Sequence, residues 1–309
     1  MKELVSPKEA VLEFERFIVS EYLRYGSVDE IFRQHNDRAL GISYPGVYHV
    51  LNRWGVVRGL GRTNTPLTES IEFLVRKIEK KIPLGTLYRS TPPSFRPSMA
   101  TLHTIYRWAK RVVKEEIEKR DMRRAGTALF VTPHLSPNLV LLGRDTAPPR
   151  LDVGKPYGAI SLPMGFSKSW ERKRAALRVL QQEVFTNKLI ENPASFNETA
   201  NQLIDGLDPF MFLDIADVRV SVYHLELPRE LSSLENFSSF KLKNFRFERV
   251  EDVLTMSQSK YLLRLGIEEI ATGYLKYQER LAQGTTEPFY MDSFFNQRLA
   301  LLVANQESV

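Results

Sequence analysis

The chain has 309 residues, of which 43% are hydrophobic and 26% are charged, the composition of a globular protein that buries a core. It contains no cysteine, which excludes disulfides and thiolate metal sites, and no apolar run approaches the roughly 18 residues that cross a bilayer. The charged N-terminus has no signal-peptide core, so we expect a cytoplasmic protein of about two domains with no membrane partner.

Positive charge is concentrated in the first part of the chain, although the net charge is only +6. Residues 1–125 carry 23 Lys and Arg against 15 Asp and Glu, whereas residues 126–309 carry 20 against 22. This asymmetry is typical of a nucleic-acid-binding half joined to a neutral half. The alternative is a lysine-rich helical surface that faces only solvent.

A block of sequence near the N-terminus is repeated 56 residues later. The sequence ERFIVSEYLRYGSVDEIFR at 15–33 corresponds to IEFLVRKIEKKIPLGTLYR at 71–89. After a slip of two residues, YHVLNRW at 48–54 corresponds to LHTIYRW at 102–108. A repeat with a fixed period defines a structural unit, so the two copies should share one fold.

The first copy has the pattern of three helices. Apolar residues at helical spacing predict a helix over 8–24, and the capping-box sequence SVDE, which starts at Ser27, predicts a short second helix to about residue 34. Ser43 can cap a third helix, which Gly55 should end. The apolar face of this third helix, expected to pack inward, consists of Val47, Val50, Leu51 and Trp54.

The outward face of the third helix has the residue types of a DNA-recognition helix. Such a helix needs polar or flat side chains that reach base edges and cations that reach phosphates. Asn pairs with adenine, and Arg with guanine or a phosphate. The alternative is a solvated face of a small helical bundle. The residues that we predict to contact DNA are Tyr44, Tyr48, His49, Asn52 and Arg53.

The second copy repeats this plan, with helices predicted over 68–81 and 83–90 and a third helix from the cap Ser98 to about residue 118. Between the copies, Arg58 and Arg62 belong to a segment that suits a plain linker or a basic arm against DNA. Two such units resemble the bipartite helix-turn-helix regions of paired-type and transposase DNA-binding domains, in architecture only. The outward residues of the last helix are Met99, Thr101, His103, Thr104 and Arg107.

The second half of the chain has a different texture. Short apolar runs from residue 126 onward, separated by Pro and Gly, predict strands. A helix is expected over 169–187, further strands over 218–227 and 245–250, and a long helix over 257–281. Strands around an internal helix, followed by a closing helix, predict an α+β domain.

Part of this half resembles the Nudix hydrolase family. The strand LLGR at 141–144 and the loop Pro163–Gly165 match the family's strand and its Pro-Gly-Gly loop, with Met164 in place of one glycine. The resemblance covers about residues 124–285 and implies an α/β/α sandwich that cleaves nucleoside diphosphate-linked compounds with Mg²⁺. Glu171 follows the loop at the family's spacing, and with one residue deleted Arg178, Leu180 and Glu183 fall on the family's Arg, aliphatic and final Glu.

The departures from the family pattern concern the metal ligands. Two carboxylate positions of the family are Val179 and Gln182 here, only Glu183 survives, and the closing Gly is Phe185. Mg²⁺ needs several oxygen ligands, usually carboxylates, to activate water for diphosphate cleavage. We therefore predict a pseudoenzyme with no metal, no cofactor and no catalytic residue, in which the scaffold is kept and the chemistry is lost.

Charged residues of the degenerate loop and helix are candidates for holding a phosphorylated ligand without a metal. A solvated basic helix face is the alternative. Acidic residues at 205, 208, 214 and 217 should cap solvated turns, with a relocated metal site as the alternative. The predicted ligand-binding residues are Arg144, Lys168, Glu171, Arg174, Arg178 and Glu183.

The leading interpretation is a multidomain transcriptional regulator that binds double-stranded DNA. It has helix-turn-helix units over 1–60 and 61–121 and a degenerate Nudix-like domain over 122–309. By resemblance to Nudix-related regulators, this domain binds a nucleotide or sugar-phosphate effector or forms a homodimer. The alternatives are an active Nudix-type hydrolase with a DNA-tethering region and a protein-interaction scaffold.

Overall fold

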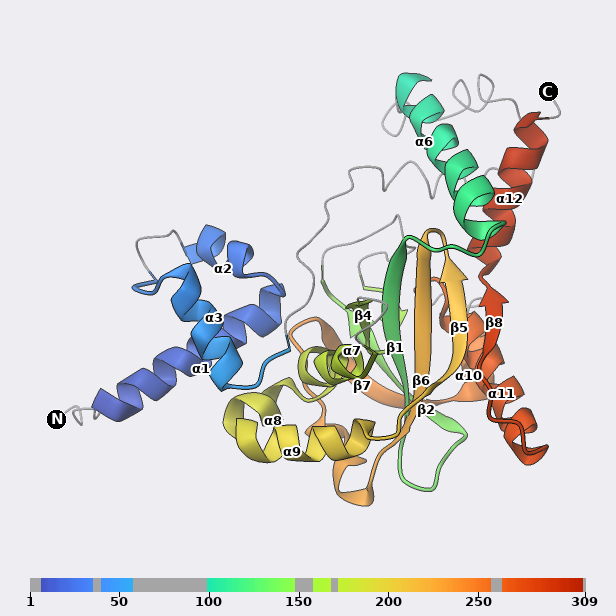
Figure 1. The fold of residues 1–309 in the computed structure, drawn as a ribbon. Coiled ribbons are helices and arrows are strands. Elements are labelled where there is room, and N and C mark those ends of the chain that lie inside the picture. The colour runs from blue at the N-terminus through green and yellow to red at the C-terminus, as the bar shows by residue number, and fades with distance from the viewer. Residues whose placement is uncertain are drawn as a thin grey trace.

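The computed structural model describes residues 7–35, 40–57, 99–147, 158–167, 172–256 and 263–307 (Figure 1). The first two predicted helices of the second copy lie outside these residues, together with the predicted cap Ser98. Four predicted site residues also lie outside them: Arg58, Arg62, Lys168 and Glu171.

The three helices predicted for the first copy are confirmed as α1 (Pro7–Tyr25), α2 (Val28–His35) and α3 (Tyr44–Arg53). The Ser43 hydroxyl accepts a hydrogen bond from the Gly46 N–H at 3.3 Å, as expected of an N-cap. Eight residues connect α2 to α3, more than the three or four of the usual helix-turn-helix. The three helices are therefore established, whereas the helix-turn-helix assignment stays a prediction.

The last helix of the second copy is confirmed as α6 (Met99–Arg111), which continues as the π-helix η2 (Val112–Ile117). It lies beside the C-terminal helix α12 (Phe294–Glu307), at the opposite end of the molecule from α1–α3 (Figure 1). The described helix of the second copy, α6, therefore lies apart from α1–α3, with the α+β domain between them (Figure 1). The apolar residues that α6, η2 and α12 bury together include Ala109, Val112, Val113, Phe295, Leu299, Leu302 and Val303.

In the described residues, eight strands form two sheets. The larger sheet has the order β4-β1-β6-β5-β8, with β1 parallel to β6 and β5 parallel to β8, and the smaller sheet has the antiparallel order β3-β2-β7. The larger sheet comprises β1 (Arg124–Thr132), β4 (Met164–Ser167), β5 (Pro209–Ile215), β6 (Val218–Glu226) and β8 (Phe289–Asp292). The smaller sheet comprises β2 (Leu139–Asp145), β3 (Ile160–Ser161) and β7 (Leu242–Arg249).

Helices cover both faces of the larger sheet. Along β1, Leu129 and Val131 face one core, whereas Ala128 and Phe130 face the other. This alternation confirms the expected α+β domain with its layered sandwich. The first core includes helices α7 (Arg172–Val179), η4 (Leu180–Val184), α8 (Thr186–Glu191) and α9 (Pro193–Ile204), and the second includes α10 (Val250–Met256) and α11 (Ile267–Ala282).

The sequence pattern missed several of these elements. The helix expected over 169–187 is present over 172–184, where α7 continues as the π-helix η4, but it ends earlier than predicted and a new helix starts after Phe185. Strand β5 is buried at every position, so it lacks the alternation that marks a half-buried strand. The long helix expected over 257–281 is α11, which begins at Ile267 in the described residues. Two 3-10 turns, η5 (Arg229–Leu231) and η6 (Leu234–Asn236), connect β6 to β7.

The first helical unit shares its core with the Nudix-like domain. Ile18 and Leu51 of this unit belong to the same buried cluster as Leu180 and Leu189, because α1 packs against η4 and α8. The described residues contain no helix of the length and apolar character that a membrane span requires.

Candidate functional site

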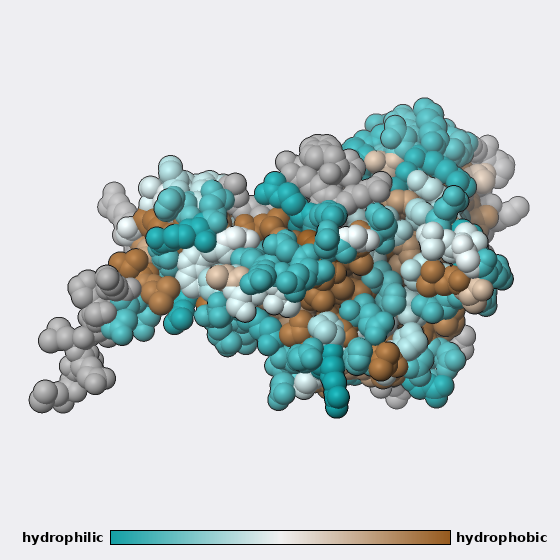
Figure 2. Space-filling model, turned by 60° about the horizontal axis from the view of Figure 1, so that its bottom comes forward, coloured by the Kyte–Doolittle hydropathy of each residue, from teal (hydrophilic) through white to brown (hydrophobic). Residues whose placement is uncertain are grey.

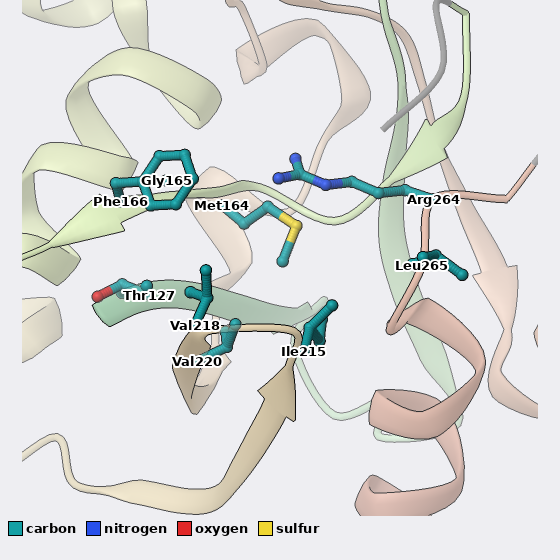
Figure 3. Close-up of a pocket in the computed structure, with 10 residues that line it drawn as sticks. Thr127, Met164, Gly165, Phe166, Ile215, Val218, Val220, Arg264 and Leu265 are labelled. Atoms are coloured by element: carbon teal, nitrogen blue, oxygen red, sulfur yellow. The ribbon is translucent and has the colours of Figure 1, made fainter. Parts of the chain in front are cut away.

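A largely apolar pocket opens beside the loop that matches the Nudix pattern. It lies between β4, the start of β1 and the β5–β6 turn, and its cavity volume is about 30 Å³, within about 390 Å³ of empty space that includes the open solvent at its mouth (Figure 3). Two residues with polar groups, Thr127 and Arg264, lie among its apolar walls, and the guanidinium of Arg264 extends across the pocket above Met164. The remaining lining is Gly126, Gly165, Phe166, Ile215, Val218, Val220 and Leu265.

Two arginines lie at or beside the pocket, and each is paired with a buried carboxylate. The Nη1 atom of Arg264 lies 3.8 Å from the Oδ2 atom of the buried Asp145, which orients the guanidinium. The guanidinium of Arg124 lies 5.5 Å from the centre of the Phe166 ring. The guanidinium over apolar walls can contact an anionic group, but the cavity itself has room for only about one or two water molecules.

Arg124 is itself held by a buried carboxylate at the β5–β6 turn. Asp217 pairs with Arg124 and with Arg123. Burial alone would raise the pKa of Asp217, but the hydrogen bonds from Arg124 and Arg123 outweigh it, so the pKa lies below its usual value. This carboxylate therefore stays charged and fixes both arginines.

The helix positions that carry metal ligands in the Nudix family have other roles here. Val179 is buried in the core, where its methyl groups provide no ligand atom. Glu183 is buried and accepts a hydrogen bond from Lys241 Nζ at 2.9 Å. Gln182 is also buried, and its Nε2 atom has no hydrogen-bond partner. A lysine ammonium thus occupies the side of Glu183 that a cation would need.

These residues do not fit Mg²⁺, because that ion needs several oxygen ligands and one lysine-paired carboxylate offers too few. No group of three His, Asp or Glu side chains with metal-binding geometry occurs among the described residues. Three of the four acidic residues considered for a relocated site are paired, and the fourth, Asp208, is exposed. Asp205 contacts Lys173 at 3.0 Å, Asp214 contacts Arg219 at 2.8 Å, and Asp217 is paired as described above.

The structure does not gather the predicted ligand-binding residues into one site. Arg144 is exposed on β2, beside Gly158, and Arg174 is exposed on α7. Arg178 is buried beneath the loop, where a Cβ atom on Gly165 would lie 3.6 Å from its Nη2 atom. Together with Glu183, these are the four described members of the set, and none of them lines the pocket. No motif in the sequence marks Arg264, which lies far along the chain from the residues that match the Nudix pattern.

The face of α3 has the exposure that the sequence predicts. Tyr44, Tyr48, His49, Asn52 and Arg53 are exposed, whereas Val47, Val50, Leu51 and Trp54 are buried. Hydrophobic residues also reach the surface of this unit, at the left of Figure 2. Those with the largest exposed fractions are Val11, Leu12 and Phe17 of α1.

Three cations of the first copy, Arg24, Arg33 and Arg53, are paired with acidic residues within it. Arg53 pairs with Glu15, and Arg33 pairs with Glu30 at 2.6 Å. Residues 1–57 contain seven Lys and Arg against eight Asp and Glu. The positive surplus of the N-terminal region therefore lies entirely in residues 58–125, which contain sixteen against seven. Of the two copies, only the second has the charge that DNA phosphates attract.

A stripe of cationic side chains follows the outer face of α6 and η2. Its members, spaced by about one helical turn, are exposed and lie away from the α12 contact. Lys114 at one end pairs with Glu118 at 3.1 Å. The side chains of Met99, Thr101 and Thr104 lie outside the described ones. The cationic stripe consists of Arg107, Lys110, Arg111 and Lys114, and the imidazole of His103 lies on the same face.

No family model matches the chain, and no curated protein matches it. Solved structures to which it is similar include a NUDIX hydrolase from Alicyclobacillus acidocaldarius (14% identity, 53% of this chain, 96% of that chain, TM-score 0.38). Another is a NUDIX hydrolase from Nitrosomonas europaea (13%, 55%, 78%, 0.34). A third is an Ap4A hydrolase from C. elegans (15%, 52%, 98%, 0.32). Similarities this low do not transfer a function, which has to be argued from the side chains.

Proposed function

We propose that the protein is a DNA-binding transcriptional regulator whose Nudix-like domain binds a ligand without hydrolysing it. The observation that carries this proposal is the cationic stripe on α6 and η2. An exposed helix with cations along one face is suited to a groove of double-stranded DNA, where the cations contact phosphates. The opposite face is occupied by α12, so only the basic face is presented.

The non-hydrolytic role of the Nudix-like domain is supported by Val179 and Glu183. One family carboxylate is replaced by a core methyl side chain, and the surviving one is paired with Lys241. Hydrolysis of a diphosphate without a metal-activated water would need another source of charge neutralisation. The predicted nucleotide or sugar-phosphate effector would place its phosphate at the Arg264 guanidinium and its ring at the open mouth of the pocket, because the cavity itself is too small for a ring.

Selection of bound sequences from a random pool of duplex DNA tests this function. Because α3 and α6 lie at opposite ends of the molecule, we expect one enriched subsite, read by α6 (Figure 1). Affinity should fall steeply as salt rises, as expected of phosphate contacts. Two subsites about one helical turn apart would instead support DNA contacts by both copies of the repeat. No enrichment, or binding that ignores salt, would contradict the proposal.

Single substitutions distinguish the two candidate recognition helices. Arg107→Ala should weaken binding by about 1–3 kcal/mol if Arg107 contacts a base. Arg53→Ala should have a smaller effect, because Arg53 already pairs with Glu15. Equal losses for both variants would restore α3 as a DNA contact, and no loss for Arg107→Ala would remove α6 from that role.

The second candidate function is hydrolysis of a nucleoside diphosphate-linked compound. It is favoured by the retained loop over Arg178 and by the retained Glu183. Mg²⁺-dependent release of phosphate or nucleoside monophosphate from ADP-ribose, abolished in Glu183→Gln, would establish it. A protein-interaction scaffold is the third candidate, which the exposed apolar residues of α1 favour for the first copy.

A further inference from the structure

The end of α3 is attached to the Nudix-like domain by two amide side chains. Gln181 of η4 accepts a hydrogen bond from the Val57 N–H at 2.8 Å and donates to the Gly55 carbonyl at 2.8 Å. Asn197 of α9 donates to the Trp54 carbonyl at 3.2 Å and accepts from Gln181 Nε2 at 3.1 Å. Gln181 is fully buried, so these bonds are shielded from water.

The fit at this attachment is close. Gly55 has a φ angle of +66°, and a Cβ atom there would lie 2.4 Å from Asn197 Nδ2. The other end of the contact is weaker, with the Arg24 guanidinium 5.1 Å from the centre of the Phe240 ring. The first helical unit is therefore positioned mainly by Gln181 and Asn197 and by the apolar core beneath them.

One helix connects this attachment to the loop of the ligand pocket. Strand β4 packs against α7, where a Cβ atom on Gly165 would lie 3.6 Å from Arg178 Nη2 and 3.9 Å from Val179 Cγ2. Arg178 and Gln181 are three residues apart on the continuous helical segment of α7 and η4, which passes through Val179 in the core. A helical segment packed in this way moves as a rigid element, so a shift at Gly165 reaches Gln181.

We propose that η4 is a joint between the β4 loop and the first helical unit. Gln181 and Asn197 hold the end of α3, so a displacement of the β4 loop moves the first helical unit. The helix that carries metal chemistry in the Nudix family therefore has a positioning role in this chain. The π-helical turn at Leu180–Val184 is consistent with such a role, since π-turns within helices often mark functional positions. The joint acts irrespective of DNA binding, so it can be tested separately from the proposed function.

The absence of cysteine allows clean site-specific labelling of the full chain. Spin labels at N52C on α3 and E279C on α11, both exposed positions, report the distance between the two units by pulsed electron paramagnetic resonance. Gln181→Met should broaden the distance distribution and lower Tm by roughly 3–8 °C, because it leaves the Val57 N–H and the Gly55 carbonyl unpaired. An unchanged distance distribution would contradict the proposed role of Gln181.

The neighbouring glutamine is a matched control. Gln182→Met removes an amide of the same size, whose Nε2 atom has no partner, so the distance distribution should not change and Tm should be equal or higher. Equal broadening in the Gln181 and Gln182 variants would show a general loosening of η4 and overturn the role of Gln181. Asn197→Ala, which removes the bond to the Trp54 carbonyl and keeps both bonds from Gln181 to residues 55 and 57, should give a smaller broadening and serves if Gln181→Met does not fold.

Transmission is tested by enlarging the loop side chain at Gly165. Gly165→Leu should shift the mean distance between the labels, because the added carbons press on Arg178 and Val179. In the Gln181→Met background this shift should disappear. Gly165→Ala, whose Cβ fits at ordinary contact distance, should leave the distance unchanged and controls for the loss of glycine. No shift with Gly165→Leu, or the same shift in both backgrounds, would overturn transmission through the joint.

Discussion

Trp54 is followed by Gly55 in the first copy of the repeat, whereas the equivalent Trp108 is followed by Ala109 in the second. Gly55 adopts a left-handed conformation, so α3 ends there and the chain turns into the Gln181 attachment. Ala109 keeps a helical conformation, so α6 continues into η2 and packs against α12. The two copies teach that one residue after a shared motif decides how long a helix is and which part of the molecule covers it.

The copies also differ in how their charges are used. In the first copy, Arg33 and Arg53 pair with acidic residues of the same unit. In the second copy, Arg107 and Arg111 are exposed on the outer face of α6. Surface cations that are paired within their own unit have lost much of their attraction for a polyanion, whereas a row of exposed cations on one helix face keeps more of it. The two copies of the repeat thus give a unit that packs on the α+β domain at one end and a helix with a basic face at the other.

The largest expected effect concerns the two sets of cations. Arg107→Ala, Arg111→Ala and Lys114→Ala combined should weaken DNA binding on the order of 10²-fold near 0.1 M salt, because about three phosphate contacts are lost. The matched triple Arg24→Ala, Arg33→Ala and Arg53→Ala should change binding far less. Fluorescence anisotropy across a salt series measures both, and the slope against log salt should flatten only for the α6 triple. Equal losses would erase the distinction between the copies.

A smaller effect, on the free energy of unfolding, is expected at the ion pairs of Asp217, which lie where the chain passes from η2 into β1. Asp217→Asn should destabilise the protein by about 1–3 kcal/mol, because Arg123 and Arg124 lose their buried partner. The pKa of Asp217 is lowered in the folded state, so its contribution is present above the unfolded pKa and is lost as pH falls through the folded pKa. Chemical unfolding between about pH 2 and 6 should therefore show a shallower acid loss in the variant. Parallel curves would contradict this assignment.

The helix ends provide the smallest pair of effects. Gly55→Ala should cost about 1–3 kcal/mol, because the left-handed conformation and the Asn197 contact both oppose a Cβ atom. The reciprocal change, Ala109→Gly, should cost about 1 kcal/mol through lower helix propensity alone. Hydrogen exchange should show the first loss at residues 54–57 and the second along α6. A neutral Gly55→Ala would mean that the α3 end does not constrain the attachment.

Several local features could be predicted from the sequence. Ser43 and Gly55 mark the ends of α3 because a side-chain cap and a left-handed glycine act within a few residues. The α+β character of the second half followed from alternating apolar runs, as in β6. The fully buried β5 was missed, because a strand apolar on both faces lacks the period of two.

The candidate site was predicted only in part. The loop at Gly165 and the buried Arg178 were found from the Nudix pattern, whereas Arg264 lies about a hundred residues away and belongs to no motif. The six predicted ligand-binding residues share a helix or a sequence neighbourhood, but the four described ones point in different directions. Spacing along a helix fixes which side chains share a face, and it does not fix what that face meets.

By itself, the sequence determined the local conformation of this protein and part of its chemistry: capped helices, alternating strands, and the replacement of two family carboxylates by Val179 and Gln182. The tertiary structure decided which charges remain available and which elements are joined. Arg53 is neutralised by Glu15, and Gln181 holds Gly55 across more than a hundred residues. Caps and periodicity depend on neighbours along the chain, whereas these contacts depend on how separate elements pack.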